Sequence, residues 1–291
     1  MITNEPTAQQ TPLPAEPDSG DLAQYVDTGV PQPPLPAEPP NAPWIKLLIA
    51  FFTWFGSVLL LLFVPVILAL PYLMYRWRST GVPSAEALTA DKTFIFISIA
   101  AIVPTHLLTL ALVWLVVTEG RKKPFWQTIG FEWPRYTNRF MATLICIFIA
   151  AALLGVGFIV TSLWGGSKTQ LDLLVESSIP ARFATAFVAV FTAPLIEELV
   201  YRGVLYSAIE RALGTAVAVG AVALLFAGVH VFQYINNISV ITVITLLSFT
   251  LTIVRASTGK VLPCFIIHLV FNGIQSLVIA LSPFVNLGGS S

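Results

Sequence analysis

Residues 44–71 read WIKLLIAFFTWFGSVLLLLFVPVILALP, and Lys46 is the one charged side chain in this run. Because about 20 apolar residues in a helix cross the ~30 Å hydrocarbon core of a bilayer, the run predicts a membrane-spanning helix. Further apolar runs predict spans near 93–118, 139–164, 181–205, 214–233, 238–257 and 260–282. The sequence therefore predicts an all-α, polytopic integral membrane protein with about seven transmembrane helices.

The composition excludes several classes of protein. Of the 291 residues, 56% are hydrophobic and 10% are charged, whereas soluble domains carry about 25% charged residues. The 15 Lys and Arg balance the 15 Asp and Glu, so the expected partner is membrane lipid and not nucleic acid. Cys146 and Cys264 stand alone in apolar runs and predict neither a disulfide framework nor a cysteine metal site.

The composition divides the chain into four parts. Residues 1–43 are rich in proline and acidic residues, and we expect a disordered tail because such a segment buries too little apolar surface to fold. Residues 44–180 hold the N-terminal transmembrane helices, and residues 181–283 hold the last four predicted spans, which contain the candidate site residues. Residues 284–291 are expected to form a short C-terminal tail.

The distribution of Lys and Arg predicts how the chain is oriented in the membrane. Ten of these residues, Arg202 and Arg255 included, fall on the side of the N-terminus, and five fall on the other side. Basic residues are enriched in cytoplasmic links. We therefore expect the N-terminus to be cytoplasmic, in a bacterial cytoplasmic membrane.

Ionisable and amide side chains recur within three of the last four predicted spans. The fourth span contains TAPLIEELVYRG at 192–203, the fifth ends in FAGVH at 226–230, and the seventh contains HLVFN at 268–272. An ionisable group at the centre of a span costs about 2.5–3.5 kcal/mol, so such groups usually face one another or a cavity. The candidate site residues are Glu197, Glu198, Arg202, His230, His268 and Asn272.

Helix geometry predicts that these residues meet at one depth. Glu197 and His230 are equally distant in sequence from a turn at Gly214, so an antiparallel hairpin places both about 25 Å from that turn at 1.5 Å per residue. His268 and Asn272 lie about 14 Å and 20 Å from the next turn on the same side of the membrane. All four reach one level if the first hairpin projects slightly beyond the second.

Helical spacing predicts different roles for the two carboxylates. Glu198 and Arg202 are four residues apart, so they can form an ion pair within one helix and leave Glu197 free. His268 and Asn272 are also four apart and place two hydrogen-bond donors on one helix face.

Each residue also has a plainer interpretation. A lone buried histidine is often a core residue, the Glu198 and Arg202 pair can serve packing alone, and His106 is expected to be structural or interfacial. A catalytically silent membrane scaffold that binds peptide or lipid-linked partners is the alternative function. A transporter is disfavoured because no inverted repeats are evident.

Residues 181–282 resemble the CAAX protease and bacteriocin-processing (Rce1-like) family of intramembrane proteases. Its motifs Glu-Glu-x-x-x-Arg, Phe-x-x-x-His and His-x-x-x-Asn occur in order at Glu197, Phe226 and His268. The resemblance implies a membrane endopeptidase whose active site lies on the last four helices and is reached near the cytoplasmic surface. It implies a peptide or protein substrate, with or without an attached lipid, in CAAX-type prenyl protein processing or bacteriocin-related processing.

The resemblance also implies a division of labour. Glu197 and His230 would activate a water molecule, while His268 and Asn272 would stabilise the oxyanion. Glu198 and Arg202 would support the site electrostatically, and no cofactor is expected. The alternative is a zinc enzyme in which Glu197, His230 and His268 hold Zn²⁺ together with water.

Overall fold

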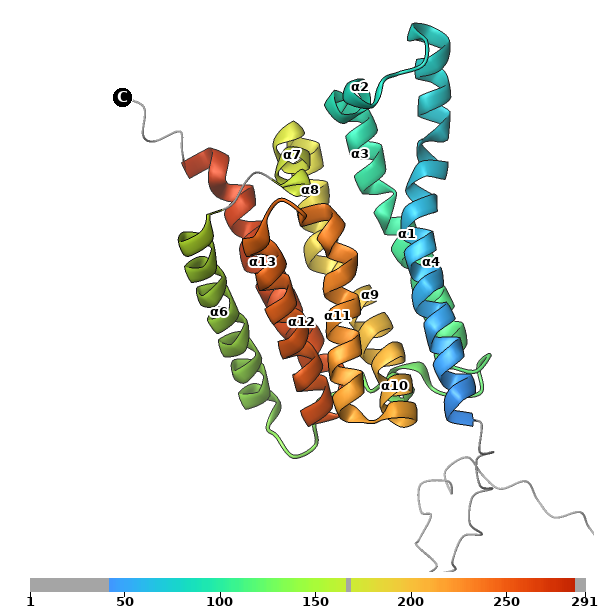
Figure 1. The fold of residues 1–291 in the computed structure, drawn as a ribbon, viewed down its shortest axis with the longest axis vertical. Helices are drawn as coiled ribbons and strands as arrows, with labels where there is room; N and C mark the ends of the chain where they lie inside the picture. The colour runs from blue at the N-terminus through green and yellow to red at the C-terminus, as the bar shows by residue number, and fades with distance from the viewer. Residues whose placement is uncertain (1–41, 166–168, 286–291) are drawn as a thin grey trace, which may run out of the picture. The chain divides into compact units, whose positions relative to one another are not determined.

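The computed structural model describes residues 42–165 and 169–285, and the described residues contain helices and no strand (Figure 1). Most of the two predicted tails, 1–43 and 284–291, lies outside the described residues. The elements are α1 (Ala42–Thr80), α2 (Ala85–Ala90), α3 (Lys92–Ala100), α4 (Ile102–Val117), α5 (Phe125–Ile129), α6 (Arg139–Trp164), α7 (Gln170–Ser177), α8 (Ile179–Phe187), η2 (Val188–Thr192), α9 (Ala193–Glu198), η3 (Leu199–Leu205), α10 (Tyr206–Leu213), α11 (Thr215–Tyr234), α12 (Ile238–Thr258) and α13 (Leu262–Val285).

Six described helical stretches are long and apolar enough to span a membrane. The second joins α3 to α4 over Lys92–Val117, and the fourth joins α8 to α10 over Ile179–Leu213. The fifth predicted span corresponds to α11, whose stretch Thr215–Val231 is apolar but shorter. The prediction of an all-α polytopic membrane protein is confirmed.

Two glycine turns mark one end of the bundle, here named the turn end. Gly214 between α10 and α11 has φ +86°, and Gly259 between α12 and α13 has φ +68°. Such left-handed backbone is accessible to glycine at little cost, so both helices end there. α1 also begins at the turn end, close to α10 (Figure 1).

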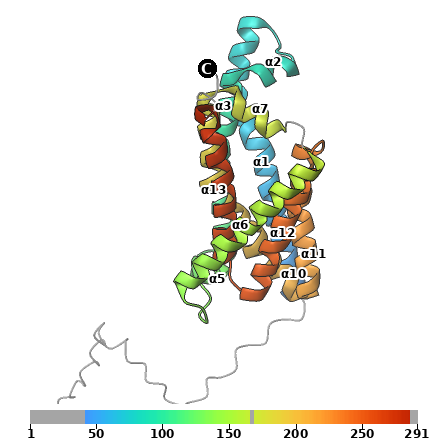
Figure 2. The ribbon, with the colours of Figure 1, turned by 90° about the vertical axis from the view of Figure 1, so that its left-hand side faces the viewer.

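The opposite end, here named the α7 end, contains α7, α2 and the far ends of α1 and α6 (Figures 1 and 2). α13 and α12 pack side by side against α6, and α11 follows next to α12. On the other side of α10 and η3 lie α1 and α4. The Nε1 of Trp54 in α1 donates to the hydroxyl oxygen of Tyr201 in η3 at 3.0 Å, which links the first span to the fourth.

The loop between α5 and α6 fastens the turn at Gly259. Val261 donates its backbone N–H to the Gly130 carbonyl at 2.8 Å, and the Lys260 ammonium donates to Glu132. This hydrogen bond and the charge of Lys260 lower the pKa of Glu132. Residues from the first half of the chain therefore fix the start of α13. They thereby fix the depth at which His268 and Asn272 lie in the bundle.

Two π-helical segments interrupt the fourth span on either side of α9. In η2 the Ala193 N–H bonds the Val188 carbonyl, and in η3 the Tyr206 N–H bonds the Tyr201 carbonyl, both five residues back. Such segments are rare in helices and frequent at functional sites. The Glu-Glu pair stands at the end of α9, directly between them.

Candidate active site

Glu198 is the centre of a buried network between two helices. Its Oε1 accepts a hydrogen bond from Arg202 at 3.0 Å and one from Nδ1 of His268 at 2.9 Å. Glu198 and Arg202 are fully buried, and His268 is 3% exposed. A carboxylate only accepts, so Nδ1 of His268 carries a proton and its Nε2 points elsewhere. The structure contains the predicted Glu198–Arg202 pair and extends it to α13.

Arg202 is fixed on its other side by α12. Its Nη2 lies 3.0 Å from the Ser248 carbonyl, 2.9 Å from the Ser248 hydroxyl and 3.3 Å from the Thr252 hydroxyl. The guanidinium also lies 4.7 Å from the centre of the Phe226 ring on α11. Sequence reasoning missed Ser248 and Thr252, because hydroxyls in an apolar run give no signal of their own.

Glu197 occupies a different environment from its neighbour. Its side chain is 25% exposed, and its Oε2 lies 3.6 Å from Nε2 of His268. Glu197 lines a cavity, and no Lys or Arg pairs with it among the described residues. One carboxylate is thus neutralised by an arginine, while the other faces the space that a substrate can enter.

His230 and Asn272 line the same cavity. Nδ1 of His230 lies 2.8 Å from the Phe226 carbonyl, and because a carbonyl only accepts, Nδ1 donates and Nε2 is left for another partner. The amide of Asn272 donates to the Ala189 carbonyl in η2 at 2.9 Å. That contact uses one of its two amide hydrogens and leaves the other for a ligand.

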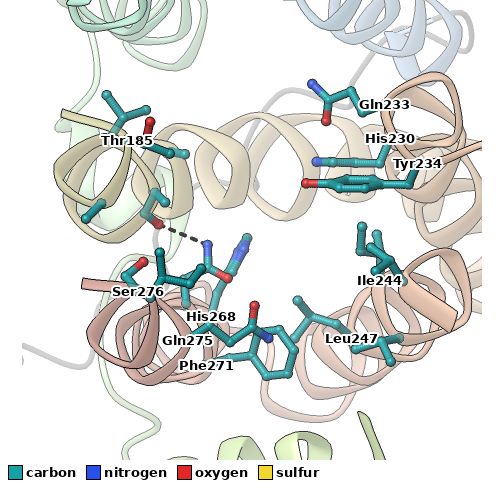
Figure 3. Close-up of a pocket in the computed structure, with 18 of the residues that line it drawn as sticks. Thr185, His230, Gln233, Tyr234, Ile244, Leu247, His268, Phe271, Gln275 and Ser276 are labelled. Carbon is teal, nitrogen blue, oxygen red and sulfur yellow. Dashed lines mark hydrogen bonds between the residues drawn. The ribbon is translucent and has the colours of Figure 1, made fainter. Parts of the chain in front are cut away.

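The cavity has a volume of about 670 Å³ and extends from Glu197 and His268 toward the α7 end. Figure 3 shows His230 and Tyr234 across the cavity from His268, and the apolar side chains of Phe271 and Leu247 on the side of His268. Polar residues continue along it toward the α7 end: Arg182, Thr185, Gln233, Gln275 and Ser276.

The direction of the cavity and the burial of two arginines bear on the orientation expected from the basic residues. The cavity runs away from the turn end, where α1 begins. The cavity and the start of α1 thus lie toward opposite ends of the bundle. Arg202 and Arg255 are buried in the bundle and do not lie in surface links. Without them, eight basic residues remain on the side of the N-terminus, compared with five on the other side.

Two further residues at the site were not among the candidate site residues predicted from the sequence. Arg255 was counted as a link residue, yet its Nε donates to the Arg202 carbonyl at 2.9 Å and its Nη2 to the Ser207 hydroxyl at 3.0 Å. His106, which the sequence predicts to be structural or interfacial, is buried and also lines the cavity. Neither belongs to a motif, so contacts between distant helices were needed to find them.

The three residues of the zinc alternative do not form a coordination site in this arrangement. Within residues 42–165 and 169–285, no three His, Cys, Asp or Glu side chains are grouped so that they could hold one ion. His268 has one ring nitrogen bonded to Glu198 and the other near Glu197.

Comparison with known proteins agrees with the motifs. Residues 179–274 match the family described as type II CAAX prenyl endopeptidase Rce1-like. No curated protein and no solved structure matches the chain. The matched segment runs from the start of α8 into α13 and contains all six candidate residues. Residues 179–274 are thus similar to the type II CAAX prenyl endopeptidase Rce1-like family.

Proposed function

We propose that this protein is an intramembrane endopeptidase of the CAAX type in which Glu197 is the general base. The observation that carries the proposal is the contrast between two adjacent carboxylates. Glu198 is fully buried and bonded to both Arg202 and His268, whereas Glu197 is partly exposed and lines the cavity. Oε2 of Glu198 has no partner but is buried, so of the two carboxylates Glu197 is the one that water in the cavity can reach to give up a proton.

The reaction begins with a water molecule held in the cavity. The water donates one hydrogen to Glu197 and the other to the free Nε2 of His230. Glu197 takes its proton as the water oxygen attacks the scissile carbonyl, and the proton then passes to the leaving amine. Fixed Nδ1 contacts on both histidines support this step, since the rings are already oriented before substrate binds.

The negative charge that develops on the carbonyl oxygen needs donors. Asn272 has one amide hydrogen to offer, and it is held in place by the Ala189 carbonyl. His268 donates from Nε2 when both ring nitrogens carry a proton, and that imidazolium would stand between Glu198 and Glu197. A single donor to such an oxyanion contributes about 2.7–4 kcal/mol to the transition state.

The proposed substrate is a peptide or protein segment that carries a lipid near the scissile bond. The family suggests a prenylated CAAX sequence, and bacteriocin-related processing is the other role that the resemblance implies. Apolar side chains along one side of the cavity, including Ile244, Leu247 and Phe271, support a substrate with an apolar part (Figure 3).

The test compares purified Glu197→Gln with wild type on a quenched-fluorescent, farnesylated peptide that ends in a CAAX sequence. We expect turnover to fall by at least about a hundredfold, the usual scale for loss of a general base, with unchanged membrane insertion. Glu86→Gln is the matched control, because Glu86 is exposed on α2. Near-normal cleavage by Glu197→Gln would refute the assignment, and no cleavage by wild type would refute the substrate class.

A further inference from the structure

His106 is a buried histidine of α4 that lies outside the family segment. It is 8% exposed, and α4 packs against η2 and α9, which lead to Glu197. His106 lines the same cavity as Glu197, His230 and His268. A third imidazole therefore borders the site, contributed by the N-terminal half of the chain.

The hydrogen bonds of His106 define which ring nitrogen carries the proton. Nδ1 lies 2.9 Å from the Thr192 hydroxyl oxygen. That hydroxyl also reaches the Val188 carbonyl at 3.3 Å; when it donates its single hydrogen there, it accepts from His106 and Nδ1 is the donor. Nε2 is then an acceptor. Within the described residues no hydrogen bond to Nε2 is found, and the His106 side chain lines the cavity.

The position of His106 along the site follows from Thr192. Thr192 precedes Glu197 by five residues, which corresponds to about 7.5 Å along a helix axis. Ala189, Ala193 and Glu197 follow one another at intervals of four and all line the cavity. An extended peptide advances about 3.3 Å per residue, so Nε2 lies within two or three residues of a scissile bond held at Glu197.

Peptides carry backbone N–H groups that lose hydrogen bonds with water in such a cavity. The other lining residues contributed by α1, α3 and α4 are apolar: Leu61, Ile99 and Ile102. A buried N–H without an acceptor is costly. We propose that Nε2 of His106 accepts a hydrogen bond from a backbone N–H of the bound peptide and positions it beside Glu197. This proposal rests on the proposed function, because it requires a peptide in the cavity.

A matched pair of variants separates the two ring nitrogens. His106→Asn keeps a donor near Nδ1 for Thr192 but has no atom at Nε2. His106→Gln gives up the Thr192 contact but places an amide oxygen near Nε2. Both are made in the Glu197→Gln background, and binding of a fluorescent, farnesylated CAAX peptide is measured by anisotropy. We expect His106→Asn to weaken binding about threefold to tenfold, the size of one neutral hydrogen bond, and His106→Gln to stay within about twofold.

With Glu197 intact, His106→Asn should raise KM by the same factor and leave kcat unchanged, because the contact exists in the ground state and the transition state alike. The reverse order, with His106→Gln the weaker binder, or equal binding by both, would overturn the proposal. Peptide that binds the parent variant but is not cleaved by wild type would overturn the proposed function alone. Peptide that does not bind the parent would overturn both.

Discussion

Replacement of Arg202 by glutamine tests whether the buried pair supports the site through charge. The substitution removes the bond to Glu198 and the contacts with Ser248 and Thr252, all within a region where Arg202 and Glu198 are fully buried. Breaking a buried pair by removing one partner costs about 3–5 kcal/mol. At about 2–4 °C per kcal/mol for a chain of this size, the apparent melting temperature should fall by about 6–20 °C.

The double variant Glu198→Gln with Arg202→Gln should recover about 1–3 kcal/mol of this loss, because no uncompensated charge is then buried. Activity per folded molecule should recover in part as well, since a glutamine at 198 can still accept from His268. The assay is thermal unfolding in detergent by size exclusion, followed by cleavage at equal folded amounts. Arg78→Gln, an exposed change at the end of α1, is the control. A double variant as unstable and as inactive as the single one would refute the reasoning and indicate that Arg202 contacts the substrate.

Further predictions concern the metal, the packing and the membrane. Exhaustive chelation should leave the activity of the purified protein unchanged, and activity that disappears and returns with added zinc would establish the zinc alternative. Gly203→Ala should destabilise the fold by about 1–3 kcal/mol in thermal unfolding, because a Cβ there would lie 2.5 Å from Cγ1 of Ile129. Lys260→Ala should lower thermal stability at neutral pH but not in acid. Its partner Glu132 has a lowered pKa, so the contribution is present above the ordinary pKa of glutamate and is lost as pH falls through the lowered one. Ser79→Cys, at the α7 end, should react with an impermeant maleimide in intact cells if the N-terminus is cytoplasmic, as the basic residues predict. Both native cysteines are buried, so they should not contribute. Labelling only after permeabilisation would instead place the α7 end in the cytoplasm.

Features that depend on neighbouring residues could be predicted from the sequence. Long apolar runs define spans because backbone groups in lipid must be bonded within the helix. The turns at Gly214 and Gly259 follow from the conformational freedom of glycine. The pairing of Glu198 with Arg202 follows from their separation of four residues. The ion pair forms even though Arg202 lies in a π-helical segment.

Contacts between distant parts of the chain were decided only by the tertiary structure. The carboxylate of Glu198 is shared with His268, 70 residues away, and Arg255 bonds the Arg202 carbonyl, 53 residues away. Neither contact has a sequence pattern, because each depends on how helices rotate and slide against one another. The two π-helical segments were also not predictable from the sequence pattern. Their wider turns change which side chains of the fourth span face the cavity. The direction of the cavity and the approach of His106 to it depend on packing between spans, and packing is not encoded in any single apolar run.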